Sequence, residues 1–219
     1  MTDELTHRLA RREDLPALAA LMDAAIGELQ RAFLSEAQVA ASRIFMGLDS
    51  QLIEDGTYFR VDCDGDLAGC GGWSRRATLY GGDHSPGRDA ALLDPAVDPA
   101  RIRAMYTHPS AARRGVGRLI LSLCEAAARA EGFRSAEMAA TLSGQPLYVA
   151  CGYRPVEWFE DARAGSRCRW CGWPSAWSSP LAIPPARDRG PSSAAPARVR
   201  SGAIGRGRHG RSDGGPVRS

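Results

Sequence analysis

The chain has 219 residues, of which 44% are hydrophobic and 24% are charged, and its formal net charge is +3. This length and apolar content are enough for one enzyme-sized domain with a packed core. No apolar run approaches 18 residues, which excludes a membrane-spanning helix, and the acidic start Met1 to Glu4 does not resemble a secretory signal, so we expect a cytoplasmic protein.

Charge divides the sequence into two parts. Residues 1–162 hold 17 arginines against 23 acidic residues, a net charge of −6, whereas residues 163–219 hold 11 arginines against 2 acidic residues, a net charge of +9. From Pro180 onward almost every residue is Pro, Gly, Ser, Ala or Arg, so there is little apolar surface to bury. We therefore predict a folded domain over 1–162 and a disordered basic tail over 163–219.

Helices and strands alternate in the first half of the domain. Residues 5–11 are a strand candidate, and a helix is expected to open at residues 13–16 and to run through Leu29 with apolar residues spaced by three and four. Ser35 and Gln38 form the pattern of a capping box, which predicts a second helix.

A hairpin and a long loop come next. Residues 57–62 and 67–75 are predicted to pair across Asp64-Gly65-Asp66. Residues 77–99 are rich in Gly, Asp and Pro, and long loops in compact domains are more often functional than idle. Four loop acids could draw a cationic substrate, although loop acids are ordinarily only solvated: Asp83, Asp89, Asp94 and Asp98.

The second half continues the mixed α/β order. A strand is predicted over 102–107, a helix over 115–131, and then a strand, a helix and a strand over 135–140, 145–151 and 154–159. The apolar positions predicted to form one face of the first of these helices are Leu119, Ile120, Leu123, Ala127 and Ala130.

The most informative segment joins that strand to that helix. Arg113-Arg114-Gly115-Val116-Gly117-Arg118 follows Pro109 and runs into an apolar helical pattern. Glycines allow a ligand to approach the backbone, and the first turn of a helix leaves N–H groups without internal partners. The segment lacks the spacing of a dinucleotide fingerprint and the lysine of a P-loop. It predicts a pyrophosphate-binding loop.

The chain resembles the GNAT acetyltransferase superfamily over about residues 5–160. Gly115 and Gly117 match the acetyl-CoA loop of that family, with Ala112 standing where Gln or Arg is usual. A second block matches further on, where Tyr148 precedes Gly152-Tyr153; here Thr141 and Gly144 stand where the family often has Asn and Ala.

The resemblance implies an α/β (α+β) fold with a GNAT-like central mixed β-sheet flanked by helices, in which two strands splay apart around the pantetheine. It implies an N-acetyltransferase that moves the acetyl group of acetyl-CoA directly to a primary amine of a small molecule. The reaction is expected to need no metal. The residues expected to bind acetyl-CoA are Met105, Tyr106, Thr107, Arg113, Arg114, Gly115, Val116, Gly117 and Arg118, and Tyr148 is expected to protonate the leaving thiolate. Members of the family often form homodimers.

The general base is not singled out by the sequence. An alkylammonium must lose a proton before it can attack. Glu137, His84 and His108 are candidates, each of which has a structural role as the alternative.

Cysteines give no disulfide framework in a chain of this length. Cys124 and Cys151 fit small buried positions. Cys168 and Cys171 form a CxxC, but a second pair of ligands is missing, so we expect no metal.

The family resemblance stops one strand short, so the last strand of the sheet is predicted to be missing or replaced. Codon degeneracy indicates that residues 164–176, read in a frame shifted by two bases, would encode an apolar strand. We therefore favour a frameshift origin for the tail. The alternative is a native tail, in a catalytically impaired acyl-CoA-binding protein or in a protein that binds nucleic-acid phosphates without sequence specificity.

Overall fold

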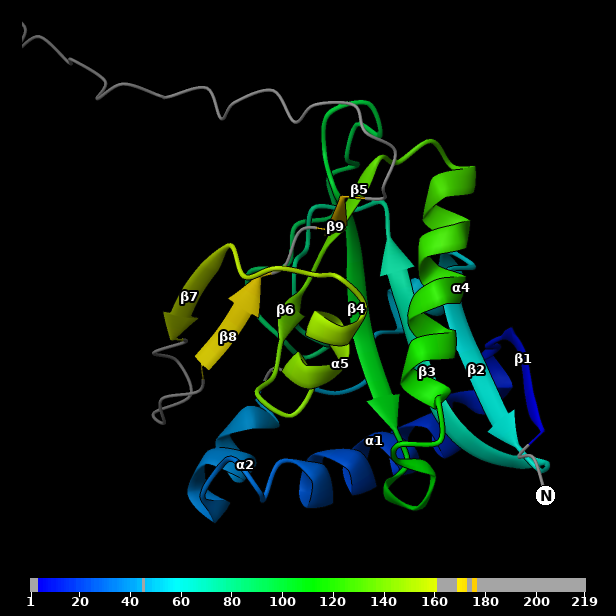
Figure 1. Ribbon diagram of the computed structural model, residues 1–219, viewed down its shortest axis with the longest axis vertical. Helices are drawn as coiled ribbons and strands as arrows, with labels where there is room; N and C mark the ends of the chain where they lie inside the picture. The colour runs from blue at the N-terminus through cyan, green and yellow to red at the C-terminus, as the bar shows by residue number, and fades with distance from the viewer. Residues whose placement is uncertain (1–3, 45, 161–168, 173–174, 177–219) are drawn as a thin grey trace, which may run out of the picture. The chain divides into compact units, whose positions relative to one another are not determined.

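A mixed six-stranded sheet forms the centre of the domain, with strand order β1-β2-β3-β4-β5-β9 (Figure 1). The computed structural model describes residues 4–44, 46–160, 169–172 and 175–176. The strands of this sheet are β1 (Leu5–Leu9), β2 (Tyr58–Cys63), β3 (Asp66–Ser74), β4 (Ala100–Thr107), β5 (Ser135–Glu137) and β9 (Ser175–Ala176). A second sheet, of order β6-β8-β7, contains β6 (Ala139–Ala140), β7 (Glu157–Glu160) and β8 (Arg169–Gly172). The predicted α/β class is confirmed.

Helices cover both faces of the central sheet. Helix α4 (Val116–Ala130) lies across β2 and β3 on one face, and α1 (Leu15–Leu29) lies behind β3 and β4 on the other (Figure 1). The remaining helices are α2 (Glu36–Ser42), α3 (Ser50–Glu54) and α5 (Gln145–Ala150). Two hydrophobic clusters result, one around Ile120 and Trp73 and one around Leu18 and Tyr58. No helix among the described residues has the length and hydropathy that a membrane span requires.

The expected start of α2 is confirmed. Ser35 accepts a hydrogen bond from the backbone N–H of Gln38, and the Gln38 side chain accepts one from the N–H of Ser35, which completes the capping box. The short helix α3 was not predicted, because its five residues are too few to show a helical period.

Glycines on β3 bring α4 unusually close to the sheet. A Cβ atom at Gly71 would lie 2.6 Å from Cγ2 of Ile120 and 2.8 Å from Cγ of Met105, and one at Gly69 would collide with Val116. The missing side chains therefore leave room for the helix.

The buried face of α4 differs from the predicted one. Its buried residues are Val116, Ile120, Leu121, Cys124 and Ala128. Leu119, Leu123 and Ala127 are only partly buried, and Ala130 is exposed. Of the predicted face, only Ile120 is fully buried. The glycines of β3 leave room for Val116 and Ile120, so the helix packs against the sheet through the face that carries these two residues.

The strands β4 and β5 are joined only at their beginning. Ala100 pairs with Ala136 and Arg101 with Glu137 in parallel register, and no further pairs follow between these strands. Beyond Met138 the chain enters β6, which belongs to the other sheet, so the predicted strand over 135–140 is broken in two. In the part of the chain that the structure describes, the rest of β4 consequently has β3 as its neighbour on one side and no strand on the other.

Two short segments of the basic tail are strands. β8 pairs with β6 and β7, and β9 pairs with β5. The backbone of these six residues completes two sheet edges. A replaced last strand, which was one of the two expectations, fits this arrangement. Residues 161–168, 173–174 and 177–219 lie outside the described residues, so the rest of that prediction and the frameshift hypothesis remain predictions.

A buried carboxylate fastens β1 and β2 to the start of α1. Asp14, with 5% of its surface exposed, accepts hydrogen bonds from the guanidinium groups of Arg8 at 2.6 and 2.7 Å and of Arg60 at 3.0 Å, and from the N–H of Arg11 at 2.8 Å. The hydrogen bond from Arg8 contributes most to holding the pKa of Asp14 far below its usual range.

We predict that Gly71→Ala lowers the free energy of unfolding by about 1–3 kcal/mol, because the new methyl group overpacks the contact between α4 and β3. Gly27→Ala is the matched control. Gly27 lies within α1 with only the end of Arg43 near its Cβ position, at 3.5 Å, so this change should be neutral or stabilising by up to about 1 kcal/mol. Urea unfolding of both variants measures the difference; equal stabilities would contradict the close packing.

We predict that Asp14→Asn destabilises the domain by about 3 kcal/mol at pH 7, since Arg8 and Arg60 both lose the buried carboxylate that they contact. The folded-state pKa of Asp14 is lowered, so its contribution is present above the unfolded pKa of about 4 and is lost as the pH falls through the folded pKa. The unfolding free energy of the variant should therefore vary less between about pH 5 and pH 2 than that of the parent chain. Parallel pH slopes would exclude this role.

Candidate active site

A bulge in β4 lies where the strand has no partner on the β5 side. Ala104 and Met105 together face the single residue Gly71, and the register shifts between Cys70 and Gly72. Ala104 has a left-handed φ of 49°, a conformation that is costly for a residue with a Cβ atom. The hydroxyl of Tyr58 donates a 2.7 Å hydrogen bond to the carbonyl of Ala104, which holds the bulge in place.

Backbone groups of Met105 and Thr107 face the open side of β4. The N–H of His108 donates to the carbonyl of Ala68 on β3 at 2.8 Å. Because backbone groups alternate in direction along a strand, those of Tyr106 also face β3, and those of Met105 and Thr107 face away from it. The open edge therefore offers main-chain donors and acceptors to a ligand.

Tyr106 turns its side chain to the other face of the sheet. It is 91% buried in the cluster that contains α1, and its hydroxyl accepts a 2.9 Å hydrogen bond from the N–H of Gly47. Of the three strand residues predicted for the site, Tyr106 thus supports the fold with its side chain, while Met105 and Thr107 present backbone to the open edge.

The predicted pyrophosphate loop ends in a helix with free N–H groups. Arg113 and Gly115 have left-handed φ values of 64° and 88°, which turn the chain sharply into α4. Within α4 the first helical bond runs from the N–H of Leu119 to the carbonyl of Gly115. Among the described residues, no acceptor is recorded for the N–H groups of residues 115–118, and no side chain caps the helix. These four groups form the kind of anion site that helix N-termini provide.

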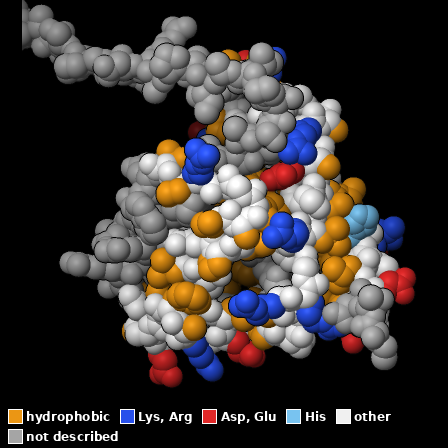
Figure 2. Space-filling view, viewed as in Figure 1, with side chains coloured by type: hydrophobic (Ala, Val, Ile, Leu, Met, Phe, Trp, Pro, Cys, Tyr) orange, Lys and Arg blue, Asp and Glu red, His pale blue; other side chains and the backbone are white. Residues whose placement is uncertain are grey.

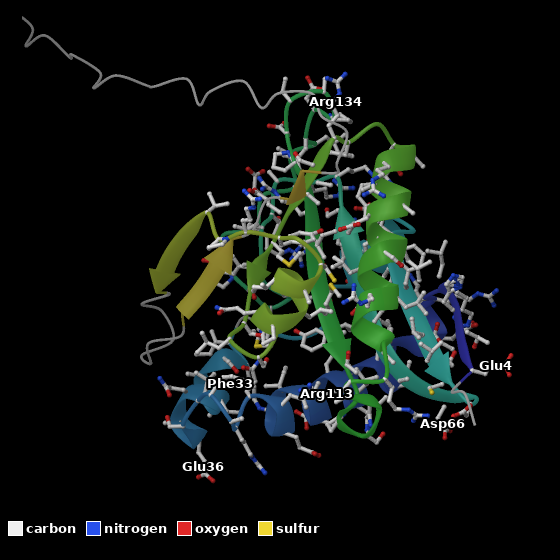
Figure 3. The ribbon with its side chains drawn as sticks, in the orientation of Figure 1. Glu4, Phe33, Glu36, Asp66, Arg113 and Arg134 are labelled. Atoms are coloured by element: carbon white, nitrogen blue, oxygen red, sulfur yellow. The ribbon has the colours of Figure 1, made fainter. Side chains whose placement is uncertain are left out.

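Arg114 differs from its neighbours in the loop. Its N–H donates to the carbonyl of Ala111 at 3.4 Å, and its guanidinium contacts Asp64 at 3.1 Å. Arg113 and Arg118 are exposed, and Arg113 lies beside the start of α4 in Figure 3. The donors of the site are therefore the N–H groups of residues 115–118, with arginine charge around them.

Helix α5 closes the other side of the open edge. A Cβ atom at Gly117 would lie 2.9 Å from Cδ2 of Leu147 and 3.7 Å from the hydroxyl of Thr107. Gly117 thus allows α4, α5 and the end of β4 to meet. Figure 2 shows a hollow with hydrophobic walls at the position where β4 and α5 lie in Figure 1.

Tyr148 on α5 reaches the bulge. It is 92% buried, and its hydroxyl lies 3.8 Å from the sulfur of Met105. Burial raises the pKa of Tyr148 well above that of a free phenol, so the hydroxyl keeps its proton at neutral pH. The structure therefore brings a protonated donor to the residue whose backbone faces the open edge.

The three candidate bases all have local partners. Glu137 forms an ion pair with Arg101 at the point where β4 and β5 are still joined. The Nε2 atom of His84 lies 2.9 Å from the carbonyl of Arg43, and Nδ1 of His108 lies 2.7 Å from the hydroxyl of Ser110. None of these recorded contacts is with Tyr148 or Met105, so the structure favours the structural alternative for all three.

The acids of the loop over 77–99 hold the loop itself. Each accepts a hydrogen bond from a backbone N–H: Asp83 from Ser50, Asp89 from Ala91, Asp94 from Ala96 and Asp98 from Asp94. These contacts fit the solvated, structural alternative better than a surface for cationic substrates. The loop is nevertheless built around charge, because Arg88 and Arg103 both contact the fully buried Asp49.

Sequence reasoning missed several residues that shape the site. The bulge at Ala104 and its anchor Tyr58 have no motif. The run Gly69 to Gly72 does carry a signal, since repeated glycine in a strand indicates close approach of another segment. Arg103 is a second signal, because an arginine within a buried strand is rarely left without a charged partner, which indicates a buried ion pair.

A metal site has no support in the part of the chain that the structure describes, where no group of three or more His, Cys, Asp and Glu side chains is placed to hold an ion. Of the CxxC, Cys168 lies outside the described residues. Cys124 is fully buried, as expected, and Cys151 is partly exposed.

Residues 54–155 match the model of the acetyltransferase (GNAT) domain, which confirms the resemblance in the sequence over this part of the chain. No curated protein sequence matches the chain significantly.

Solved structures show the same fold at low sequence identity. A GCN5-related N-acetyltransferase from Rhodopseudomonas palustris is 19% identical, with a TM-score of 0.58 over 80% of this chain and 96% of that chain. The PaiA N-acetyltransferase from Thermoplasma acidophilum, in complex with coenzyme A, is 11% identical with a TM-score of 0.53 (77% and 98% covered). An N-acetyltransferase from Staphylococcus aureus Mu50 is 14% identical with a TM-score of 0.52 (79% and 98% covered).

Proposed function

We propose that this protein is an acetyl-CoA-dependent N-acetyltransferase that acts on a primary amine of a small molecule. The observation that carries the proposal is the unpaired start of α4 next to the open edge of β4, with the Tyr148 hydroxyl at Met105. A pyrophosphate at the start of α4 and a thioester at the open edge of β4 would belong to one acyl-CoA molecule. The coenzyme A bound to the Thermoplasma acidophilum relative supports this choice of cosubstrate.

The binding role falls to backbone groups. The N–H groups of residues 115–118 would hold the pyrophosphate, and the helix dipole and the charges of Arg113 and Arg118 add attraction. The open-edge backbone of Met105 and Thr107 would hydrogen-bond the pantetheine. An N–H aimed at the thioester oxygen stabilises the tetrahedral intermediate by about 3 kcal/mol.

The chemistry needs one proton to leave and another to be supplied. The uncharged amine attacks the thioester carbon, a C–N bond forms, and collapse of the intermediate breaks the C–S bond. Tyr148 would give its proton to the departing thiolate and regain one from solvent, while the proton of the acceptor nitrogen goes to water. Burial keeps the phenol protonated at neutral pH, as a proton donor must be before the transfer.

We predict that Tyr148→Phe lowers kcat about 100-fold, with the dissociation constant of coenzyme A changed less than threefold. Tyr153→Phe is the matched control: the Tyr153 ring lies 6.1 Å from that of Tyr148, and its hydroxyl donates to Glu125 at 2.8 Å. That change should leave kcat within about twofold, because Glu125 is not a group of the proposed reaction. Thiol release from acetyl-CoA measures both; equal rates for parent and Tyr148→Phe would remove the assigned acid.

We predict that Arg113→Gln weakens coenzyme A binding about fivefold, in proportion to the loss of one exposed charge near the pyrophosphate. The loss should shrink at 1 M salt, where exposed charges are screened. Arg134→Gln is the control, since Arg134 is also exposed but lies at the far end of α4 in Figure 3. Calorimetric titration measures the dissociation constant of coenzyme A for both variants. Identical values would contradict pyrophosphate binding by the loop before α4.

A further inference from the structure

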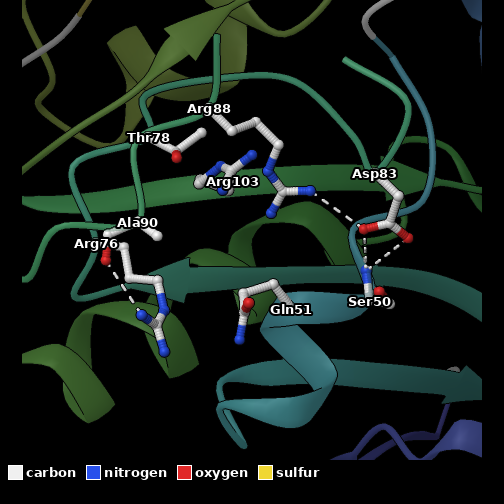
Figure 4. A pocket seen from close by; sticks show the side chains of 8 residues that line it. All are labelled: Ser50, Gln51, Arg76, Thr78, Asp83, Arg88, Ala90 and Arg103. Carbon is white, nitrogen blue, oxygen red and sulfur yellow. Dashed lines mark hydrogen bonds and ion pairs between the residues drawn. The ribbon is translucent and has the colours of Figure 1, made fainter. Parts of the chain in front are cut away.

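A second site lies beside β4, on the side of the sheet that carries α3. It is a pocket of 140 Å³ whose walls come from α3, Arg76 beyond the end of β3, the loop over 77–99 and β4 (Figure 4). Its charged and hydroxyl-bearing lining includes Ser50, Arg76, Thr78, Asp83, Arg88 and Arg103. Pockets for drug-sized ligands are about 300–1,000 Å³, so this one fits a small polar group and not a whole cofactor.

Two carboxylates outside the pocket, of which Asp49 is buried and Asp55 partly buried, hold its arginines in place. Asp49 has none of its side chain exposed and contacts Arg88 at 2.6 Å and Arg103 at 2.8 Å. Asp55 forms hydrogen bonds of 2.7 and 2.8 Å with Arg76. Neither Asp49 nor Asp55 lines the pocket. The guanidinium groups are thus preorganised, which lowers the entropic cost of binding an anion.

Arg103 presents an unused donor. Its side chain is 97% buried, one terminal nitrogen contacts Asp49, and the other donates to the carbonyl of Gly81. Its Nε–H has no hydrogen-bond partner among the described residues. A buried donor without an acceptor is unfavourable. Arginine donors match the planar, acceptor-only geometry of a carboxylate.

The pocket is close to the proposed site of acetyl transfer. Arg103 precedes the bulge in β4, and two residues along a strand place its Cα about 7 Å from that of Met105. Arg103 therefore joins the pocket to the strand that carries the bulge.

We propose that this pocket binds a carboxylate of the acetyl acceptor, so that the substrate is a small amine that also carries a carboxylate. The proposal rests on the N-acetyl transfer proposed above. The carboxylate takes no part in the bond changes: the C–N bond forms at Met105 while the acid group is held by Arg88 and Arg103. Its role is to position the amine and to select the substrate.

Kinetics with matched amine pairs test the selection. Each of three ω-amino acids is compared with the amine that lacks its carboxylate: β-alanine with ethylamine, 4-aminobutyrate with propylamine, and 5-aminopentanoate with butylamine. We expect kcat/KM to favour at least one amino acid by about tenfold or more, the scale on which charge-assisted hydrogen bonds act. Equal or better turnover of every plain amine would overturn the proposal while leaving N-acetyl transfer intact.

Arg88→Gln tests the pocket itself. This change leaves Arg103 to balance the buried Asp49, so it avoids the unpaired buried charge that a change at Arg103 would create. We expect KM for the favoured amino acid to rise about tenfold, with kcat and the KM of its plain amine changed less than twofold. Arg12→Gln is the control, because Arg12 is 78% exposed and contacts only Glu54 among its recorded ion pairs. An unchanged KM in Arg88→Gln would overturn the proposal.

A binding measurement keeps the test independent of turnover. The Nε–H signals of ¹⁵N-labelled arginine in the full chain are followed while the three amino acids and their plain amines are added. Movement of a signal that Arg88→Gln perturbs, with an amino acid and not with its plain amine, supports the pocket even if no acceptor is acetylated. The absence of any such movement contradicts it, whether or not the chain transfers acetyl groups.

Discussion

The close approach of α4 to β3 is the contact on which the rest of the site depends. Gly69 and Gly71 leave no side chain between strand and helix, so Val116 and Ile120 rest against the backbone of the sheet. That contact fixes where the helix starts, and its unpaired N–H groups consequently lie beside the end of β4. It also leaves room for Met105, whose position opposite Gly71 is part of the bulge. A ligand site made of backbone needs this fixed spacing, because main-chain donors cannot adjust as side chains do.

Separation of β4 from β5 is the second half of the arrangement. The two strands pair at only two positions, after which β5 gives way to a strand of another sheet. An open sheet edge is normally unfavourable because its hydrogen-bonding groups lack partners. Here the edge is enclosed by α4 and α5, and Tyr58 holds the bulged carbonyl on the other side. Among the described residues, no strand pairs with Met105 or Thr107 on this side of β4.

Two buried aspartates join segments that are far apart in the sequence. Asp14 joins the first two strands to α1, and Asp49 joins the long loop to β4 through Arg88 and Arg103. Breaking such a pair leaves a charge without compensation, so each cluster ties segments that are far apart in the sequence. The loop over 77–99, which has little apolar surface, keeps its shape through these ion pairs and through its own acids. Its composition predicted a functional loop; in the structure its acids accept backbone hydrogen bonds, and its Arg88 joins Arg103 of β4 in contacting Asp49.

The sequence by itself predicted most of the element order, the glycine-rich turn into α4 and the helix that carries Tyr148, because periodicity, capping residues and glycine spacing are local properties of the chain. The capping box at Ser35 and the hairpin across Gly65 follow from such local rules. Only the tertiary structure decided which face of α4 is buried, where β4 bulges, that Tyr106 points away from the open edge, and that Arg76, Arg88 and Arg103 meet in one pocket. These features arise from contacts between residues far apart in the chain, and no local pattern encodes the distance at which two such segments meet.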